Sequence, residues 1–160
     1  MDLTNVSKDE KTWKEHLRER KLVNIRKFYE YFRKGEVMPF DELFTDYAVW
    51  IMNGRWTDKV PFAGTYQGKA RITGLFEEYF RALQIIEFRH EYEIVDGCEI
   101  VVHFNLKARV AATNKTFDME FFDHFKVDEK AKIFFCRRYY DTFTFVLPFQ
   151  AKGPSHIVDT

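Results

Sequence analysis

Apolar and polar residues alternate over three long stretches of the chain, which is the pattern of half-buried antiparallel strands. The stretches are 85–95, 100–110 and 116–141, and the charged turn Asp128–Ala131 divides the last of them. Because apolar residues alternate on both sides of that turn, we expect residues 116–141 to form a hairpin of two antiparallel strands.

Helical spacing replaces this alternation in other stretches. A capping box at Ser7–Glu10 precedes apolar residues that recur at intervals of three and four from Trp13 to Phe32, and a second such pattern covers 69–83. A short helix is predicted to begin at Pro39, and a strand at 48–52 follows it.

These elements together predict an α+β domain in which helices pack on the concave side of a curved antiparallel sheet and enclose a pocket. The chain has 160 residues, which suits a single domain over 1–160. We expect its core at about 20–142 and a C-terminal arm at 143–160. The arm begins with an apolar run, and we expect it to cover the pocket or a partner subunit.

Composition narrows the classes of partner. The 25 basic and 25 acidic residues cancel, so we expect no nucleic-acid partner. The polar N-terminus and the lack of a long apolar run predict a cytoplasmic protein without a membrane partner. Cys98 and Cys136 are expected to be free thiols. The 18 phenylalanines indicate a large aromatic pocket or an apolar oligomer surface.

Asp123 is the candidate with the clearest chemistry. It shares one face of its strand with apolar residues, namely Phe117, Met119, Phe121, Phe125 and Val127. A buried carboxyl group must be paired, hydrogen-bonded, protonated or beside a cavity. Asp123 is therefore either a core residue with a structural partner or a pocket residue.

Arg138 is the predicted partner of Asp123. If Val127 lies opposite Lys132 across the turn, Asp123 lies opposite Cys136 and Arg138 is its diagonal neighbour on the same face. We expect the two to pair, which makes Asp123 an ionised base or an orienter of Arg138 toward an anionic substrate group. If Arg138 points to solvent instead, Asp123 is a neutral hydrogen-bond donor.

Several motifs resemble the nuclear transport factor 2-like superfamily, in particular SnoaL-like cyclases and ketosteroid isomerases. They are the hairpin 123–133, Phe40–Ala48, Phe62–Gly68 with the helix after it, and Arg138–Thr142. The resemblance covers about residues 20–142 and implies a cone-shaped, cystatin-like fold and a homodimer. It also implies isomerase, dehydratase, cyclase or epoxide hydrolase chemistry.

In ketosteroid isomerases, an Asp in the place of Asp123 points into the steroid pocket. The Tyr on their first helix corresponds to Phe28 here, and their general base corresponds to Met52 or Asn53. Phe28 cannot donate the hydrogen bond of that Tyr, and neither Met52 nor Asn53 can act as a general base. This argues against steroid isomerase activity in the known form. Tyr29 and Tyr31 lie near Phe28 but are expected to be packing residues.

Three further positions remain open. Asn53 and Trp56 are predicted to line the mouth of the pocket, although Asn53-Gly54 also fits a simple turn. His90 lies on the apolar face of its strand, where it is either a hydrogen-bonded core residue or a proton shuttle. His90 and the other histidines lack metal-ligand spacing, so we assign no metal and no cofactor.

The candidate catalytic residues are therefore Asp123, Arg138 and His90, and the candidate substrate-binding residues are Trp56, Asn53, Phe121, Tyr140 and Phe28. The leading interpretation is an enzyme that acts on a small apolar or aromatic molecule by proton transfer. An anionic group on that molecule would fit Arg138. The alternative is a non-catalytic ligand-binding or dimerisation module, which the missing base and the missing Tyr favour.

Overall fold

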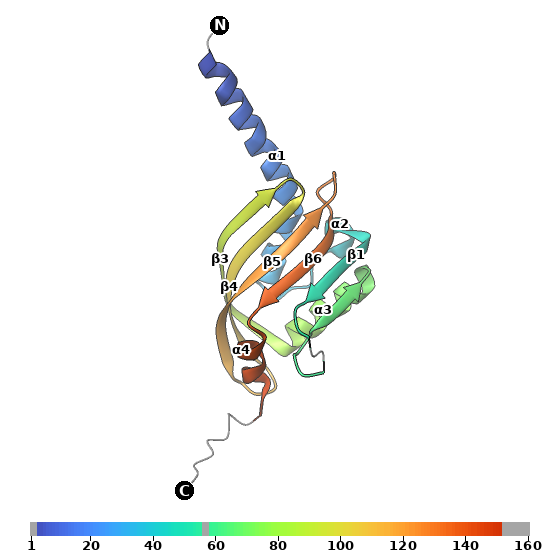
Figure 1. The fold of residues 1–160 in the computed structure, drawn as a ribbon. Helices are drawn as coiled ribbons and strands as arrows, with labels where there is room; N and C mark the ends of the chain where they lie inside the picture. Colours follow the sequence, from blue (N-terminus) through green and yellow to red (C-terminus); the bar gives the residue numbers. More distant parts are fainter. Residues whose placement is uncertain (1–2, 56–57, 152–160) are drawn as a thin grey trace.

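The computed structural model describes residues 3–55 and 58–151, and Trp56 lies outside the described residues (Figure 1). The elements in chain order are α1 (Leu3–Phe32), α2 (Phe40–Leu43), β1 (Phe44–Met52), β2 (Gly64–Gln67), α3 (Lys69–Ala82), β3 (Leu83–Asp96), β4 (Glu99–Val110), β5 (Thr116–Val127), β6 (Ile133–Tyr140), α4 (Thr142–Val146) and the 3-10 turn η1 (Leu147–Phe149).

The six strands form one curved sheet in the order β2-β1-β6-β5-β4-β3, and the helices α1, α2 and α3 lie on one side of it (Figure 1). The predicted α+β class is confirmed. The curved sheet is confirmed as well, but it is mixed, because β1 and β6 run parallel, with Trp50 paired to Cys136, where antiparallel strands were predicted. Alternation along single strands does not reveal the direction of a neighbour that is reached by a long crossover.

Aromatic side chains fill the space between the helices and the sheet. Phe28 of α1 has no exposed surface, and its ring lies 5.3 Å from that of Trp50 and 5.5 Å from that of Phe76. Phe104 and Phe121 of the sheet are also fully buried and stack on each other at 5.3 Å. Many of the phenylalanines therefore belong to a closely packed core.

Helix α1 is longer than predicted. It begins at Leu3, so the predicted capping box at Ser7–Glu10 lies inside the helix. Residues 8–16 are all exposed, and burial begins only near Leu22 (Figure 1). The first half of α1 thus projects beyond the sheet (Figure 1).

The register of the β5–β6 hairpin differs from the prediction. Val127 lies opposite Ile133 rather than Lys132, and an irregularity between Lys126 and Val127 places Lys126 opposite Phe135. A β-bulge accommodates one extra residue in this way, and strand alternation alone does not show it. The different pairing at the turn and the bulge each shift the register by one residue, so Asp123 lies directly opposite Arg138 and not opposite Cys136.

Strand β3 also contains register shifts, one of them between His90 and Tyr92. His90 lies opposite the core residue Phe104, whereas Tyr92 lies opposite His103 on the outer face. Strict alternation along 85–95 predicts Tyr92 and Ile94 on the same face as His90, and this prediction is wrong because a bulge reverses the faces that follow it. Both Tyr92 and Ile94 are exposed.

Candidate functional site

The centre of the domain holds a buried ion pair. Arg138 Nε donates to Asp123 Oδ1 and Arg138 Nη2 donates to Asp123 Oδ2, each at 2.7 Å, and neither side chain has any exposed surface. This is the bidentate geometry in which a guanidinium group and a carboxylate bind most strongly. The predicted pairing of Asp123 with Arg138 on one face of the sheet is confirmed.

Tyr29 completes this centre from the helical side. Its hydroxyl donates to Asp123 Oδ2 at 2.6 Å across the interface between α1 and β5. The expectation that Tyr29 only packs is therefore wrong. The sequence contained a signal, because Leu22, Ile25, Tyr29 and Phe32 follow helical spacing on one stripe, and all four are buried.

Aromatic faces surround the guanidinium group of Arg138. Its Cζ atom lies 4.8 Å from the ring centroid of Phe32, 5.2 Å from that of Phe104 and 5.3 Å from that of Trp50. At these distances the aromatic rings attract a cation. Burial lowers the pKa of Arg138, but the charge and hydrogen bonds of Asp123 outweigh burial and hold this pKa above its ordinary value.

Three buried polar atoms near the pair have no hydrogen-bond partner among the described residues: Arg138 Nη1, Tyr79 Oη and Tyr140 Oη. Burial raises the pKa of Tyr79 to about 12, although the charge of Arg138 acts in the opposite direction. Burial likewise raises the pKa of Tyr140. The sequence analysis placed Tyr140 near the site, whereas Tyr79 looked like any other member of the inner stripe of α3.

The structure places the predicted substrate-binding residues at different depths. Phe121 is fully buried, and its ring lies 5.4 Å from that of Tyr140. Phe28 packs edge-to-face against Tyr29, with ring centroids 5.1 Å apart. Asn53 is half-buried at the end of β1, where its backbone N–H donates to the carbonyl oxygen of Arg138.

His90 lies apart from this centre. Its side chain is 36% exposed, and its Nε2 lies 3.5 Å from Oε1 of Glu93 at the edge of the sheet. Glu93 also faces Arg18 and Arg26 of α1, at 3.4 and 3.5 Å. His90 is thus close to a network of ion pairs that joins α1 to β3.

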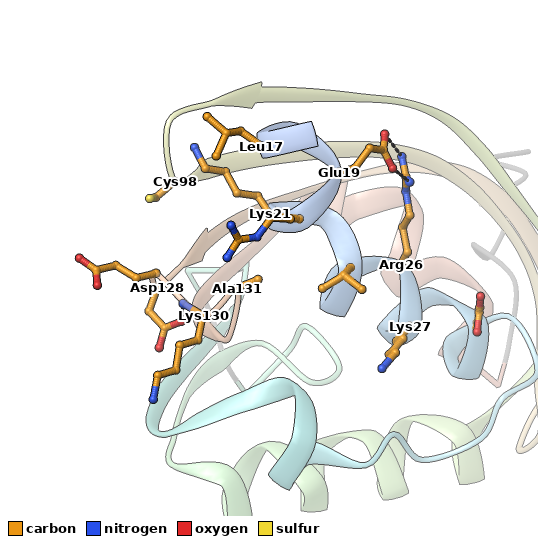
Figure 2. Close-up of a pocket in the computed structure, with 13 residues that line it drawn as sticks. Leu17, Glu19, Lys21, Arg26, Lys27, Cys98, Asp128, Lys130 and Ala131 are labelled. Carbon is orange, nitrogen blue, oxygen red and sulfur yellow. Dashed lines mark hydrogen bonds and ion pairs between the residues drawn. The ribbon is translucent and has the colours of Figure 1, made fainter. Parts of the chain in front are cut away.

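A separate groove of about 890 Å³ opens on the outside of the domain, between α1 and the turns that hold Cys98 and Ala131 (Figure 2). None of the predicted site residues that the structure describes lines it. Lys21 and Asn24 bind backbone carbonyl oxygens at its two sides, those of Gly97 and Ala131. The groove is therefore distinct from the buried centre.

Within residues 3–55 and 58–151, no group of three or more His, Cys, Asp or Glu side chains could hold a metal ion. The part of the chain that the structure describes also contains no helix that is long and apolar enough to cross a membrane.

A curved sheet with helices on one side and a polar centre between them defines an NTF2-like domain. Consistent with this, the model of the SnoaL-like domain family matches residues 25–135, which is more than half of the chain. The chain belongs to the SnoaL-like family. A search of curated proteins returned no match.

Solved structures show the same fold. An NTF2-like protein from Burkholderia xenovorans is 23% identical, with a TM-score of 0.67 over 79% of this chain and 93% of that chain. A candidate isomerase from Bacillus subtilis is 16% identical, with a TM-score of 0.73 over 84% and 96%. TerC, co-crystallised with polyporic acid, is 16% identical, with a TM-score of 0.66 over 79% and 95%.

Proposed function

We propose that this protein is a small-molecule enzyme in which Arg138 stabilises negative charge on an oxygen atom of an apolar or aromatic substrate during proton transfer. The observation that carries the proposal is the way in which Asp123 holds the guanidinium group of Arg138 in a fixed orientation. Asp123 holds its Nε and Nη2, while the buried Nη1 has no partner among the described residues. A fixed, partly unpaired cation in a water-poor interior is suited to stabilise charge that develops in a reaction.

The geometry favours the orienting role of Asp123 over the role of a base. Both of its carboxylate oxygens accept short hydrogen bonds, one from Arg138 and the other from Arg138 and Tyr29. An incoming substrate would have to displace these donors to reach the carboxylate. We therefore assign Asp123 and Tyr29 as positioning residues that hold Arg138 in place.

The chemistry that follows is simple. A base from solvent, such as hydroxide or a buffer anion, takes a proton from the carbon next to a carbonyl group, and the electron pair of the C–H bond moves onto the carbonyl oxygen. The oxygen then carries a negative charge that Arg138 Nη1 can bind. The protonated base returns a proton at another carbon of the conjugated system, and the electron pair leaves the oxygen to form the new C–H bond, which completes an isomerisation. His90 is too far removed, in the Glu93 network, to be included in this centre.

The neighbours support a small-molecule role. One is named as a candidate isomerase and another was crystallised with polyporic acid, so the same fold is associated with an isomerase assignment and with an organic acid. Since these proteins are 16% identical to the chain, they support the reaction class only by analogy.

Hydrogen–deuterium exchange of carbonyl compounds tests the proposal without knowledge of the product. The protein would be incubated in D2O with a panel of apolar and aromatic ketones, and loss of the α-proton signals would be followed by NMR. We expect faster exchange for at least one ketone, and Arg138→Lys, checked for folding, should slow it. No acceleration for any ketone of the panel would contradict the proposal.

A non-catalytic binding protein is the second candidate, and the engaged state of Asp123 favours it. In that case ketones or carboxylates would raise the melting temperature without any accelerated exchange. The two measurements on the same panel therefore separate the two functions.

We further propose a homodimer formed through the outer face of the sheet, and a cytoplasmic location. A row of aromatic and imidazole rings crosses four strands of that face, because Tyr92, His103, Phe122 and Tyr139 lie opposite one another in succession. His103 stacks on Phe122 at 4.3 Å, while Tyr92 and Tyr139 are 45% and 41% exposed. Such a ring-rich face is suited to contact a second copy.

A further inference from the structure

We propose that the hydroxyl groups of Tyr79 and Tyr140 join Arg138 Nη1 to form a site for one oxygen acceptor of the ligand, a carbonyl or carboxylate oxygen. The inference rests on the proposed function, whose site it extends. It names two binding residues and the class of ligand that they select.

The first argument is the state of the three polar atoms. Tyr79 is fully buried, Tyr140 is 9% exposed, and both hydroxyl oxygens lack a hydrogen-bond partner among the described residues, as Arg138 Nη1 does. An unpaired buried polar group destabilises the folded state, so most such groups in proteins are paired. Two of them, next to a guanidinium group whose own Nη1 is the third, indicate a position that a ligand atom fills.

The second argument is their mutual position. The Cζ atom of Arg138 lies 5.9 Å from the ring centroid of Tyr79 and 5.8 Å from that of Phe121, which in turn lies 5.4 Å from Tyr140. Burial raises the pKa of both phenols, and the charge of Arg138 acts against it at each of them. At Tyr79 hydrogen bonding by Arg138 also lowers the pKa, so the guanidinium group approaches this hydroxyl although the two atoms do not form a full hydrogen bond in the structure. Helix α3 and strand β6 thus direct the two phenols to the same guanidinium group.

The chemistry of these groups sets the selectivity. A guanidinium group only donates hydrogen bonds, and both phenols remain protonated donors at neutral pH because burial raises their pKa values. Three donors around a positive charge favour an acceptor oxygen, neutral or anionic, and repel an ammonium group.

The covering segments show where a ligand can reach this site. Phe62 packs on Tyr79 with ring centroids 5.1 Å apart, and Phe149 of η1 packs on Phe62 at 6.2 Å. Phe145 of α4 lies 5.0 Å from Tyr140. Phe62 has a φ of 64°, which is unfavourable for a residue with a side chain. Phe145 and Phe149, in the described part of the predicted C-terminal arm, therefore pack beside the phenols, and we expect a ligand to enter where Phe62 and Phe149 meet.

Three probes of similar size test the site: benzoate, acetophenone and benzylammonium. Their effects on the melting temperature and on the tyrosine Cζ resonances of protein labelled with carbon-13 would be measured for the wild type, Tyr79→Phe and Tyr140→Phe. Tyr31→Phe is the matched control, because Tyr31 only packs at the edge of the core on α1.

We expect benzoate or acetophenone, but not benzylammonium, to raise the melting temperature and to shift the resonances of Tyr79 and Tyr140. Each Tyr→Phe change in the site should weaken binding by about tenfold, the effect of one lost hydrogen bond. Without a probe, the same two variants should melt at or above the wild-type temperature, since they remove unpaired hydroxyls. Tyr31→Phe should bind as the wild type does.

The inference is overturned if no probe binds, if benzylammonium binds as well as benzoate, or if Tyr79→Phe and Tyr140→Phe bind the probes normally. A clear fall in the melting temperature of both variants would also overturn it, because the hydroxyls would then be paired in solution. Probe binding that depends on the phenols without ketone exchange would contradict the proposed enzyme alone. Ketone exchange that is unchanged in both variants would contradict the acceptor site alone.

Discussion

Asp123 and Arg138 lie directly opposite each other on β5 and β6, and two hydrogen bonds of 2.7 Å join them where neither side chain reaches solvent. Removing two charges from water is costly, and the pair compensates through its geometry, the Tyr29 hydroxyl and the surrounding rings. At this one point of the core, a large desolvation cost and the favourable interactions of the pair therefore nearly balance.

Loss of one partner is expected to be severe. Arg138→Met leaves the Asp123 carboxylate buried with only the Tyr29 hydroxyl, and we expect the free energy of unfolding to fall by about 3–5 kcal/mol. Urea denaturation followed by tryptophan fluorescence measures it. The double variant Asp123→Leu/Arg138→Met should recover much of this loss, because no unpaired charge remains.

The exposed pair of Arg81 and Glu78 on α3 provides the control, as Arg81→Ala should leave the unfolding curve unchanged. Equal stability of Arg138→Met and the wild type would show that the buried pair does not form.

Tyr29→Phe removes one donor from Asp123 Oδ2 and keeps the ring in the core. Because hydrogen bonds to charged groups are strong, we expect a loss of about 1.5–3 kcal/mol in the free energy of unfolding. Tyr31→Phe on the same helix should have little effect. If the two variants proved equally stable, the hydrogen bond at 2.6 Å would not contribute as the structure indicates.

Alkaline pH is expected to destabilise the protein through its buried phenols. Burial raises the pKa of Tyr79 to about 12 in the folded protein, so the unfolded chain releases this proton first, near the ordinary value of about 10. Stability is thus fully present below pH 10 and falls as the pH rises toward 12, by about 3 kcal/mol for this group. Urea denaturation at a series of pH values would show the decline.

The variant Tyr79→Phe isolates this contribution, since it should decline less steeply over the same range. Tyr29 and Tyr140 act in the same direction, because burial raises their pKa values too. Parallel pH profiles for Tyr79→Phe and the wild type would be inconsistent with the burial of Tyr79.

Sedimentation should give about twice the monomer mass of 19.3 kDa at micromolar concentration. Tyr139→Arg places a charge at one end of the row of rings on the outer face, so we expect it to produce monomers without loss of fold. Trp13→Arg changes a more exposed aromatic residue on the projecting part of α1 and should leave the dimer intact. Dissociation by Trp13→Arg alone would move the interface to α1.

Alternation along the strands was sufficient to predict the faces of β5 and β6, and with them the meeting of Asp123 and Arg138. Their direct opposition was not predictable, because the bulge near Val127 depends on how two strands pack together. The same holds for β3, where a bulge after His90 turns Tyr92 outward.

The parallel contact of β1 with β6 involves residues almost ninety positions apart in the chain, such as Trp50 and Cys136. Local patterns contain no information about such a pairing. Tyr29 was missed for another reason. The resemblance, counted back from Gly35, placed Phe28 at the position of the family's Tyr. It overlooked the adjacent Tyr29, although helical spacing placed Tyr29 on the buried stripe.

The projecting half of α1 is expected to be less stable against local unfolding than the rest of the protein. Residues 8–16 are exposed on every side, and an isolated helix of that length is only marginally stable in water. Their amide hydrogens should exchange with solvent through brief local fraying, whereas those from Leu22 to Phe32 should exchange only when the whole domain opens. A protease would accordingly shorten the helix to a resistant end near Leu22, and the length of that fragment would report where cooperative folding begins.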